Sequence, residues 1–189
     1  MTTDGPCRIL LIGMMGSGKS TIGRLLATSS GWPYVDNDDL VVRAHGATSR
    51  RLVAERGETE MRRAESEALA DGIVLPPPTI VGVAAGVIRD EANRRSLRDG
   101  GIVVWLRAAP DVLAERAAGA DHRPWLDEDP AAWMSATLAQ REPLYAAVAD
   151  RVVDTDSMPP EAAVRELLDW LRSETACATS ATLRSAGPP

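Results

Sequence analysis

Short apolar runs predict the strands of this chain. They are typical of strands buried on both faces, which carry near-continuous Val, Ile and Leu, and they occupy residues 8–12, 33–35, 79–83, 101–106 and 151–153. Helical spacing or composition fills the stretches between and after them, at residues 20–27, 90–98, 110–118, 130–149 and 160–173. The segment between Asp39 and Asp71 is also helical and charged, with breaks expected at Gly46 and Gly57. Strands that alternate with helices predict an α/β fold, in which a central five-stranded parallel sheet is covered by helices on both faces, giving three α/β/α layers.

The chain has the length of one compact domain. Its 189 residues can bury about two-thirds of the unfolded surface in a single core. The triplet at residues 76–78 is Pro-Pro-Pro, which cannot continue a helix and is expected to be a connector. Residues 174–189 are small, polar and without periodicity. We therefore expect one domain over residues 1–173, followed by a disordered tail.

Composition and charge favour a cytoplasmic protein. The net charge of −6 is unfavourable for a nucleic-acid partner, which needs a basic face. The first residues lack the basic start of a signal peptide, and no apolar run reaches the about 20 residues needed to cross a bilayer. Cys7 and Cys177 lie at opposite ends of the sequence, so a disulfide framework is not expected. These features exclude neither an enzyme nor a binding protein.

A phosphate-binding motif follows the first predicted strand. Residues 13–20 read Gly-Met-Met-Gly-Ser-Gly-Lys-Ser and fit the pattern G-x-x-x-x-G-K-[ST], at the point where a strand ends and a helix begins. Glycines there allow backbone N–H groups to converge on phosphate oxygens, and the helix N-terminus adds its positive dipole end. Lys19 is expected to bridge the β- and γ-phosphates of ATP, and the Ser20 hydroxyl is expected to bind Mg²⁺.

The lysine content of the chain supports this interpretation. The sequence carries 21 cationic side chains, and Lys19 is the single lysine among them. Every other cationic position is arginine, whose planar guanidinium cannot replace the compact ammonium of a phosphate-binding loop. Nucleotide phosphate binding is therefore the firmest function that the residues alone predict.

Over residues 8–172 the chain resembles the shikimate kinases, a family related to the nucleoside monophosphate kinases. Besides the phosphate-binding loop, four stretches resemble motifs of that family in the same order: Asp36-Asn37-Asp38 (D-x-D), residues 57–65 (G-E-x-x-F-R-x-x-E), residues 123–126 (R-P-L-L of a mobile lid) and residues 141–145 (R-x-P-L-Y). The resemblance implies a P-loop kinase fold with a lid at about residues 117–130, ATP and Mg²⁺ as cofactors, and a monomer that phosphorylates a hydroxyl of shikimate or a similar small acid.

The resemblance also implies roles for individual residues. The nucleotide is expected to contact Gly13, Gly16, Ser17, Gly18, Lys19, Ser20, Thr21 and Arg116. The acceptor acid is expected to contact Asp38, Arg62, Ala85 and Arg141. Lys19, Asp38 and Arg123 are the expected catalytic residues, and Ser20 with Asp36 the expected Mg²⁺ site.

Physical chemistry agrees with these assignments but does not fix each of them. Two arginines can bind a substrate carboxylate as a fork, and a carboxylate such as Asp38 can orient the attacking hydroxyl or accept its proton. The charge of Arg123 could reach the transferring phosphoryl group. Nothing in the residues alone favours Arg62 over Arg63, because both lie in one charged helical run.

The sequence departs from the family mainly where the acceptor is expected. The G-G-G turn after the third strand is Ala84-Ala85-Gly86, two pocket phenylalanines correspond to Val53 and Met61, and Trp125 replaces a lid leucine. An alanine held at positive φ would cost about 1–3 kcal/mol. The leading hypothesis is ATP-dependent phosphorylation of shikimate; the alternatives are a kinase of the same fold acting on another cyclic polyol or sugar acid, and a nucleotide-binding relative without catalysis.

Overall fold

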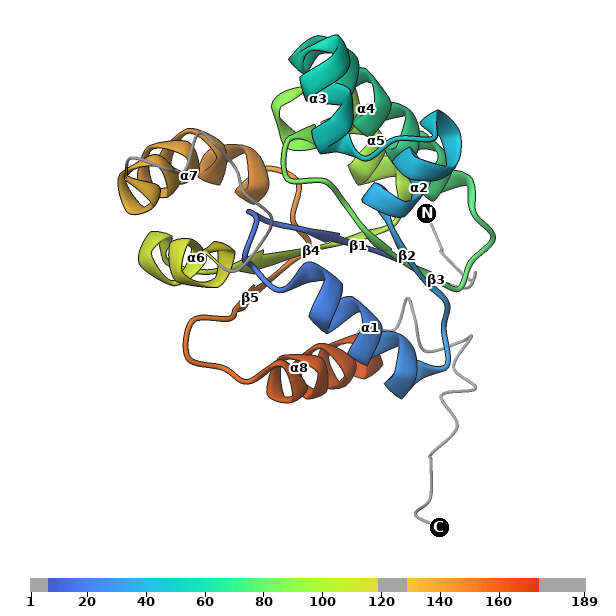
Figure 1. The fold of residues 1–189 in the computed structure, drawn as a ribbon. Coiled ribbons are helices and arrows are strands. Elements are labelled where there is room, and N and C mark those ends of the chain that lie inside the picture. The colour runs from blue at the N-terminus through green and yellow to red at the C-terminus, as the bar shows by residue number, and fades with distance from the viewer. Residues whose placement is uncertain (1–6, 119–128, 174–189) are drawn as a thin grey trace.

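The computed structural model describes residues 7–118 and 129–173, which build one parallel sheet between two layers of helices (Figure 1). The strands lie in the order β2-β3-β1-β4-β5, and each neighbouring pair is parallel. Their bounds are β1 (Arg8–Ile12), β2 (Tyr34–Asp36), β3 (Thr79–Gly82), β4 (Ile102–Arg107) and β5 (Arg151–Asp154). The predicted fold class is confirmed, and each predicted strand is present to within one residue at either end.

The helices connect these strands as predicted, with differences at their ends. They are α1 (Lys19–Ser30), α2 (Asn37–His45), α3 (Ser49–Arg56), α4 (Glu58–Val74), the 3₁₀ turn η1 (Val87–Arg89), α5 (Glu91–Gly100), α6 (Pro110–Ala117), α7 (Pro130–Ala146) and α8 (Pro160–Ser173). The charged segment divides into α2, α3 and α4 at Gly46 and Gly57, which have φ of 65° and 86°. Helix α7 ends at Ala146, three residues earlier than predicted.

Alternate residues of the central strands enter two different cores. Leu10 and Ile12 of β1 pack with Val103 of β4 against helices α4 to α7, whereas Ile9 and Leu11 pack on the opposite face against α1 and α8 (Figure 1). All of these side chains are at most 2% exposed. Because both faces of the sheet are buried, the strands carry the unbroken apolar runs from which they were predicted.

A third, smaller core joins α2, α3 and α4 beside the sheet. Leu40 and Val41 of α2 meet Leu52 of α3 and Met61 of α4 there, and Val53 packs against the cluster from its edge. This core holds helix α2, which begins directly after β2 at Asn37.

The carboxyl ends of all five strands lie at one edge of the sheet, because the strands are parallel. Ligands of open α/β folds bind in the crevice outside such an edge. The phosphate-binding loop leaves β1 there, the segment from Asp36 to Asp38 leaves β2, the turn at residues 84–86 follows β3, and Thr155 follows β5. The fold thus brings most of the predicted site residues to one edge.

The expectations for the cysteines, the lid and the C-terminal tail have different outcomes. Cys7 is disulfide-bonded, whereas its position at the opposite end of the sequence from Cys177 led us to expect no disulfide framework. The other cysteine, the expected tail at 174–189 and most of the expected lid lie outside the described residues. Within the described residues, no helix has both the length and the apolar character that a membrane crossing requires.

Candidate active site

The phosphate-binding loop turns sharply as it leaves β1. Gly13 has φ of 144°, and a Cβ there would lie 2.5 Å from the Leu106 carbonyl oxygen and 2.8 Å from Ser17 Oγ. Only glycine fits a backbone of this conformation and closeness. Gly18, with φ of 92°, forms the N-cap of α1 without a side-chain cap, so the first N–H groups of this helix are available to an anion.

Lys19 lies over the inner side of this loop. Its Nζ donates hydrogen bonds to the carbonyl oxygens of Gly13 at 3.0 Å and Met14 at 2.9 Å. The hydroxyl of Ser17 is fully buried beneath the loop, and it has no hydrogen-bond partner among the described residues. Buried polar groups without a partner are rare in folded proteins. The loop therefore has the conformation and the donors of a phosphate cradle.

Ser20 and Asp36 bring two oxygen ligands together beside the cradle. Ser20 Oγ donates to Asp36 Oδ2 at 2.8 Å, and the Tyr34 hydroxyl donates to the same oxygen at 2.7 Å. Gly82 makes room for them, because a Cβ there would lie 2.3 Å from the Tyr34 hydroxyl. Burial, followed by the contact with Asp36, raises the pKa of Tyr34, which keeps this phenol protonated.

This oxygen pair suits Mg²⁺. The ion takes oxygen ligands and is usually held by one or two protein groups together with phosphates and water. Residues 7–118 and 129–173 contain no cluster of three or more His, Cys, Asp or Glu side chains that could hold a metal by themselves. A hydroxyl and a carboxylate at the mouth of a phosphate cradle are therefore the appropriate donor set for an ion that arrives with a nucleotide.

Arg62 lies against the turn that follows β3. Its Nη1 donates to Glu65 at 2.7 Å and its Nη2 to Glu58 at 3.2 Å. A Cβ on Gly86 would lie 1.8 Å from Arg62 Nη1, so the guanidinium packs directly on the backbone of this glycine. Burial raises the pKa of Glu65, with the nearby Arg62 charge opposing that effect and the Asp38 charge adding to it.

Arg141 reaches the same turn from α7. Its Nη1 donates to the Ala85 carbonyl oxygen at 3.3 Å, and the hydroxyl of Tyr145 donates to that oxygen at 3.0 Å. Burial lowers the pKa of Arg141, and the charge of Arg62 contributes in the same direction. The two predicted acid-binding arginines thus both contact the turn at residues 84–86, Arg62 at Gly86 and Arg141 at Ala85, and they are close enough for the charge of Arg62 to act on Arg141.

Asp38, the third predicted acceptor residue with a charged side chain, lies in the first turn of α2. Its backbone N–H donates to Asp36 Oδ1 at 3.2 Å, and its own Oδ1 accepts from Ser49 Oγ at 3.3 Å. A cleft of about 580 Å³ opens at Arg62 and Glu65. Its lining residues are Glu58, Thr59, Arg62, Arg63, Glu65, Ser66, Gly86, Val87, Arg89, Asp90 and Asn93. Of the predicted acceptor residues only Arg62 lines this cleft. Asp38, Arg62 and Arg141 are nevertheless all close enough to act on the pKa of Glu65, and Arg141 contacts both Ala85 and Met14 of the phosphate cradle, so the four predicted residues lie in one region.

Arg116 and Thr21 lie on the nucleotide side. Arg116, at the end of α6, donates to the carbonyl oxygens of Thr155 at 2.6 Å and Asp156 at 3.2 Å, so it is tied to the segment after β5. Thr155 Oγ1 in turn reaches the Ser17 carbonyl oxygen at 3.4 Å. Thr21 is exposed in the first turn of α1. The predicted residues Arg123 and Trp125 lie outside the described residues.

The departures at the turn after β3 cause no backbone strain. No non-glycine residue of the described chain has positive φ, and Gly86 itself has φ of −82°. The two alanines at 84 and 85 are therefore in ordinary conformations, and the strain considered from the sequence is not present. Met61 is buried in the core of α2, α3 and α4, and Val53 packs against that core from its edge.

Sequence reasoning did not single out three residues of this arrangement. Tyr34 shares an oxygen of Asp36, Thr155 connects the segment after β5 to the loop, and Tyr145 holds Ala85. For Tyr34 a signal was available, because residues two apart in a strand lie on the same face. Tyr145 ends the R-x-P-L-Y stretch, but its contact and that of Thr155 join segments 60 and 138 residues apart, so the sequence does not show which residues they touch.

Comparisons with known proteins agree with this geometry. The family described as "Shikimate kinase" matches residues 15–172. The shikimate kinase of Moorella thermoacetica is 37% identical over 174 residues, which cover 90% of this chain and 99% of that protein. That of Pseudomonas syringae pv. tomato is 39% identical over 85% of this chain and 93% of its own. A solved shikimate kinase from Acinetobacter baumannii, in complex with shikimate, superposes with a TM-score of 0.84 at 29% identity and covers 90% of this chain and 95% of its own. With two spaced arginines at one turn, a phosphate cradle and matches of this extent, the chain belongs to the shikimate kinase family.

Proposed function

We propose that this protein is an ATP-dependent shikimate kinase, which transfers the γ-phosphoryl group of ATP to a hydroxyl of shikimate. The observation that carries the proposal is that Arg62 and Arg141 both contact the turn at residues 84–86, where Arg141 also reaches Met14 of the phosphate cradle. Two guanidinium groups at one wall of a site suit a carboxylate, and a cradle beside them suits the phosphoryl donor.

On the donor side, Lys19 and the amides of the loop would hold the phosphates. Lys19 Nζ, which now bonds to two carbonyl oxygens of its own loop, would turn to the β- and γ-phosphate oxygens. Ser20 and Asp36 would hold Mg²⁺, which offsets charge on the phosphates when it is bound. Gly13, Gly16, Ser17, Gly18 and Thr21 would complete the cradle, and Arg116 would contact the nucleotide base.

On the acceptor side, the proposed roles follow from charge and position. Arg62 and Arg141 would bind the carboxylate, and the backbone at Ala85 would contact the acid between them. Asp38, which lies at the N-terminus of α2, would align the attacking hydroxyl and could accept its proton. Arg123, which lies outside the described residues, would bring its charge to the transferring phosphoryl group.

A different acceptor of the same class is the second candidate. The methyl groups of Ala84 and Ala85 would reduce the space for the acid beside this turn. If that space is too small for shikimate, the acceptor would be another cyclic polyol or sugar acid. The third reading from the sequence, a relative that binds ATP without catalysis, needs a turn that closes the acceptor site. The unstrained backbone of this turn and the paired arginines support an open site.

The remaining properties are proposals as well. We propose a monomeric, cytoplasmic enzyme that binds neither nucleic acid nor a membrane surface. Its net charge of −6 supports this, because a negatively charged protein is repelled by nucleic acids and by anionic lipid surfaces. Light scattering coupled to size exclusion would test the monomer directly. A mass near twice that of the chain would contradict it.

A coupled assay of ADP release, with and without shikimate, tests the proposed function. Shikimate is expected to accelerate ADP release by about 10²-fold or more over the rate without acceptor. A panel of cyclic polyol acids and sugar acids, assayed in parallel, separates the first two candidates. Shikimate that is inert while another acid is active would replace the acceptor, and ADP release that no acid accelerates would contradict a kinase.

A further inference from the structure

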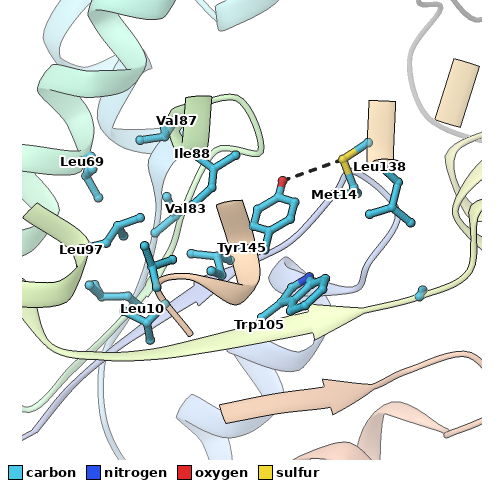
Figure 2. Close-up of a cluster of buried hydrophobic side chains, with 14 of the residues drawn as sticks. Leu10, Met14, Leu69, Val83, Val87, Ile88, Leu97, Trp105, Leu138 and Tyr145 are labelled. Atoms are coloured by element: carbon cyan, nitrogen blue, oxygen red, sulfur yellow. Dashed lines mark hydrogen bonds between the residues drawn. The ribbon is translucent and has the colours of Figure 1, made fainter. Parts of the chain in front are cut away.

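Tyr145 is buried and contacts both the phosphate-binding loop, at Met14, and the turn after β3, at Ala85. It belongs to the last turn of α7, is 1% exposed, and stacks on Trp105 with ring centroids 5.6 Å apart at an angle of 22°. Figure 2 shows its hydroxyl directed away from Trp105 and toward the sulfur of Met14, which belongs to the phosphate-binding loop. The oxygen lies 3.8 Å from Met14 Sδ and 3.0 Å from the Ala85 carbonyl oxygen.

Arg141 shares both of these contacts. Its Nη1 lies 3.8 Å from Met14 Sδ and 3.3 Å from the Ala85 carbonyl oxygen. One partly buried carbonyl thus receives two donors from the same helix, one neutral and one charged. A carbonyl oxygen has two lone pairs, so the two donors together fix the direction in which it points. The neighbouring N–H groups of the turn are fixed with it, because the peptide planes are rigid.

The shorter of the two bonds comes from the tyrosine. A neutral phenol that is locked by stacking has one position, whereas a guanidinium carries five donors and can face a ligand with any of them. If Tyr145 holds the carbonyl, the Arg141 guanidinium can turn its remaining N–H groups toward an acid without releasing the turn. Gly86, the next residue, is the one on which Arg62 packs, so the same turn also sets the position of the second arginine.

We propose that Tyr145 is a positioning residue for acceptor binding: its hydroxyl holds the Ala85 carbonyl and thereby fixes the turn at residues 84–86 that Arg62 and Arg141 both contact. This inference rests on the proposed function, because it assigns Tyr145 to the acceptor acid rather than to ATP. Tyr145 does not touch the reacting groups in this role. Its contribution is expected in the affinity for the acid.

Tyr145→Phe tests the inference, because it removes the hydroxyl and keeps the stacked ring. The KM for shikimate is expected to rise about three- to tenfold, the range that corresponds to one hydrogen bond. The KM for ATP is expected to stay within about twofold, and kcat to change less than the KM for the acid, because ground-state binding of one substrate is affected. Titration calorimetry of shikimate into the enzyme with ADP present gives the affinity independently.

Ile9→Val is the matched control. Ile9 is fully buried on the other face of the sheet, in the core with α1 and α8, and its truncation lowers stability by an amount similar to the loss of a hydrogen bond. The two variants are expected to have similar melting temperatures, with the KM for the acid raised only in Tyr145→Phe.

Two results would overturn the inference. One is a KM for shikimate in Tyr145→Phe within about twofold of the parent value; the other is a KM for ATP that rises as much as the KM for the acid. Both presuppose a parent enzyme that phosphorylates shikimate. A parent without that activity would instead contradict the proposed function, so the two failures are distinguishable.

Discussion

Ser20 and Asp36 are joined by a hydrogen bond of 2.8 Å, although they belong to different elements and lie 16 residues apart. Ser20 is in the first turn of α1 and Asp36 is the last residue of β2. Tyr34 donates to the same carboxylate oxygen at 2.7 Å and so fixes it from the other side. Two ligand oxygens are thus held in place beside the phosphate cradle before any ion is bound, which lowers the cost of ordering them on binding.

Asp36→Asn tests the proposed metal site. The amide keeps the shape of the side chain but lacks the negative charge, so we expect a higher Mg²⁺ concentration for half-maximal rate and a loss of about 10–100-fold in activity at low Mg²⁺. The measurement is the initial rate against total Mg²⁺ at fixed ATP. Asp39→Asn, three residues further along and exposed, is the matched control and should leave the curve unchanged. A normal curve for Asp36→Asn would remove this residue from the metal site.

Lys19→Ala is expected to lose about 10²-fold or more in kcat while the fold is kept. The ammonium would meet charge that develops on the transferring phosphoryl group, and no other lysine is present to replace it. The measurements are single-turnover rates and thermal unfolding of parent and variant. Turnover at the parental rate would rule out the mechanism.

Because Lys19 is the sole lysine, chemical labelling gives a second measurement. An amine-reactive reagent can modify Lys19 Nζ and the N-terminal amine, and saturating ATP should protect the lysine only. The N-terminal amine serves as the internal control for reagent strength. Equal labelling of Lys19 with and without ATP would contradict phosphate binding by this side chain.

Most of the fold could be predicted from local sequence patterns, namely apolar runs at the strands and glycines at the helix ends. Strands covered on both faces are near-continuously apolar, and the runs at β1, β3 and β4 are apolar except at their ends, where Arg8, Thr79 and Arg107 lie. Gly46 and Gly57 end helices because both have positive φ. The end of α7 was predicted too late, because Val148 and Ala149 continue the apolar spacing although the helix ends at Ala146. Val148 is buried in the same core without being helical, so burial and helix are not equivalent there.

The candidate site was less predictable where it depends on contacts between distant segments. The phosphate-binding loop carries its geometry in its own sequence, so its residues could be listed in advance. Arg62 and Arg63 cannot be separated by pattern, since they differ by one position in a charged helix. The fold separates them: Arg62 packs on Gly86, whereas Arg63 is 55% exposed and pairs with Glu60 and Glu67.

This difference gives a direct test of acid binding. Arg62→Lys keeps a positive charge but loses the fork, so we expect the KM for shikimate to rise about 10–100-fold. Arg63→Lys, on the next residue of α4, makes the same chemical change on the exposed face and should alter this KM by less than about twofold. Steady-state kinetics of the two variants at saturating ATP measure the contrast. Equal effects would contradict the assignment of Arg62.

Arg116 provides the corresponding test for the nucleotide. Its guanidinium donates to the backbone carbonyls of Thr155 and Asp156. Thr155 in turn contacts Ser17, so Arg116 is connected to the phosphate-binding loop. We expect Arg116→Lys to raise the KM for ATP about three- to tenfold and to leave the KM for shikimate unchanged, because a lysine cannot keep all the hydrogen bonds that the guanidinium makes with Thr155 and Asp156. Arg172→Lys, on the exposed side of α8, is the control. A rise in both KM values would indicate a general loss of structure instead.

Glu65 connects the site to the pH dependence of stability. It is 7% exposed, and burial raises the pKa of its carboxyl above the ordinary value even though Arg62 lies at 2.7 Å. Below the ordinary pKa, both the folded and the unfolded chain hold this proton. Between the ordinary and the raised pKa, only the folded chain holds it, so the free energy of unfolding falls as pH rises, by at most about 1.4 kcal/mol per pH unit for one proton. Above the raised pKa the loss is complete and constant.

Glu65→Gln removes this titration while keeping the size of the side chain. We expect the melting temperature of the parent, measured relative to that of Glu65→Gln, to fall as the pH is raised from about 4.5 toward neutrality and then to level off. Glu67→Gln removes the same charge from the exposed side of α4, together with its pairs to Arg63 and His45, and reports the effect of losing a surface carboxylate. A parent that gains stability relative to Glu65→Gln over the same interval would mean that the Arg62 charge outweighs burial. Glu65 would then be an ionised partner of that arginine throughout the working range, and an acid would have to compete with it for the guanidinium.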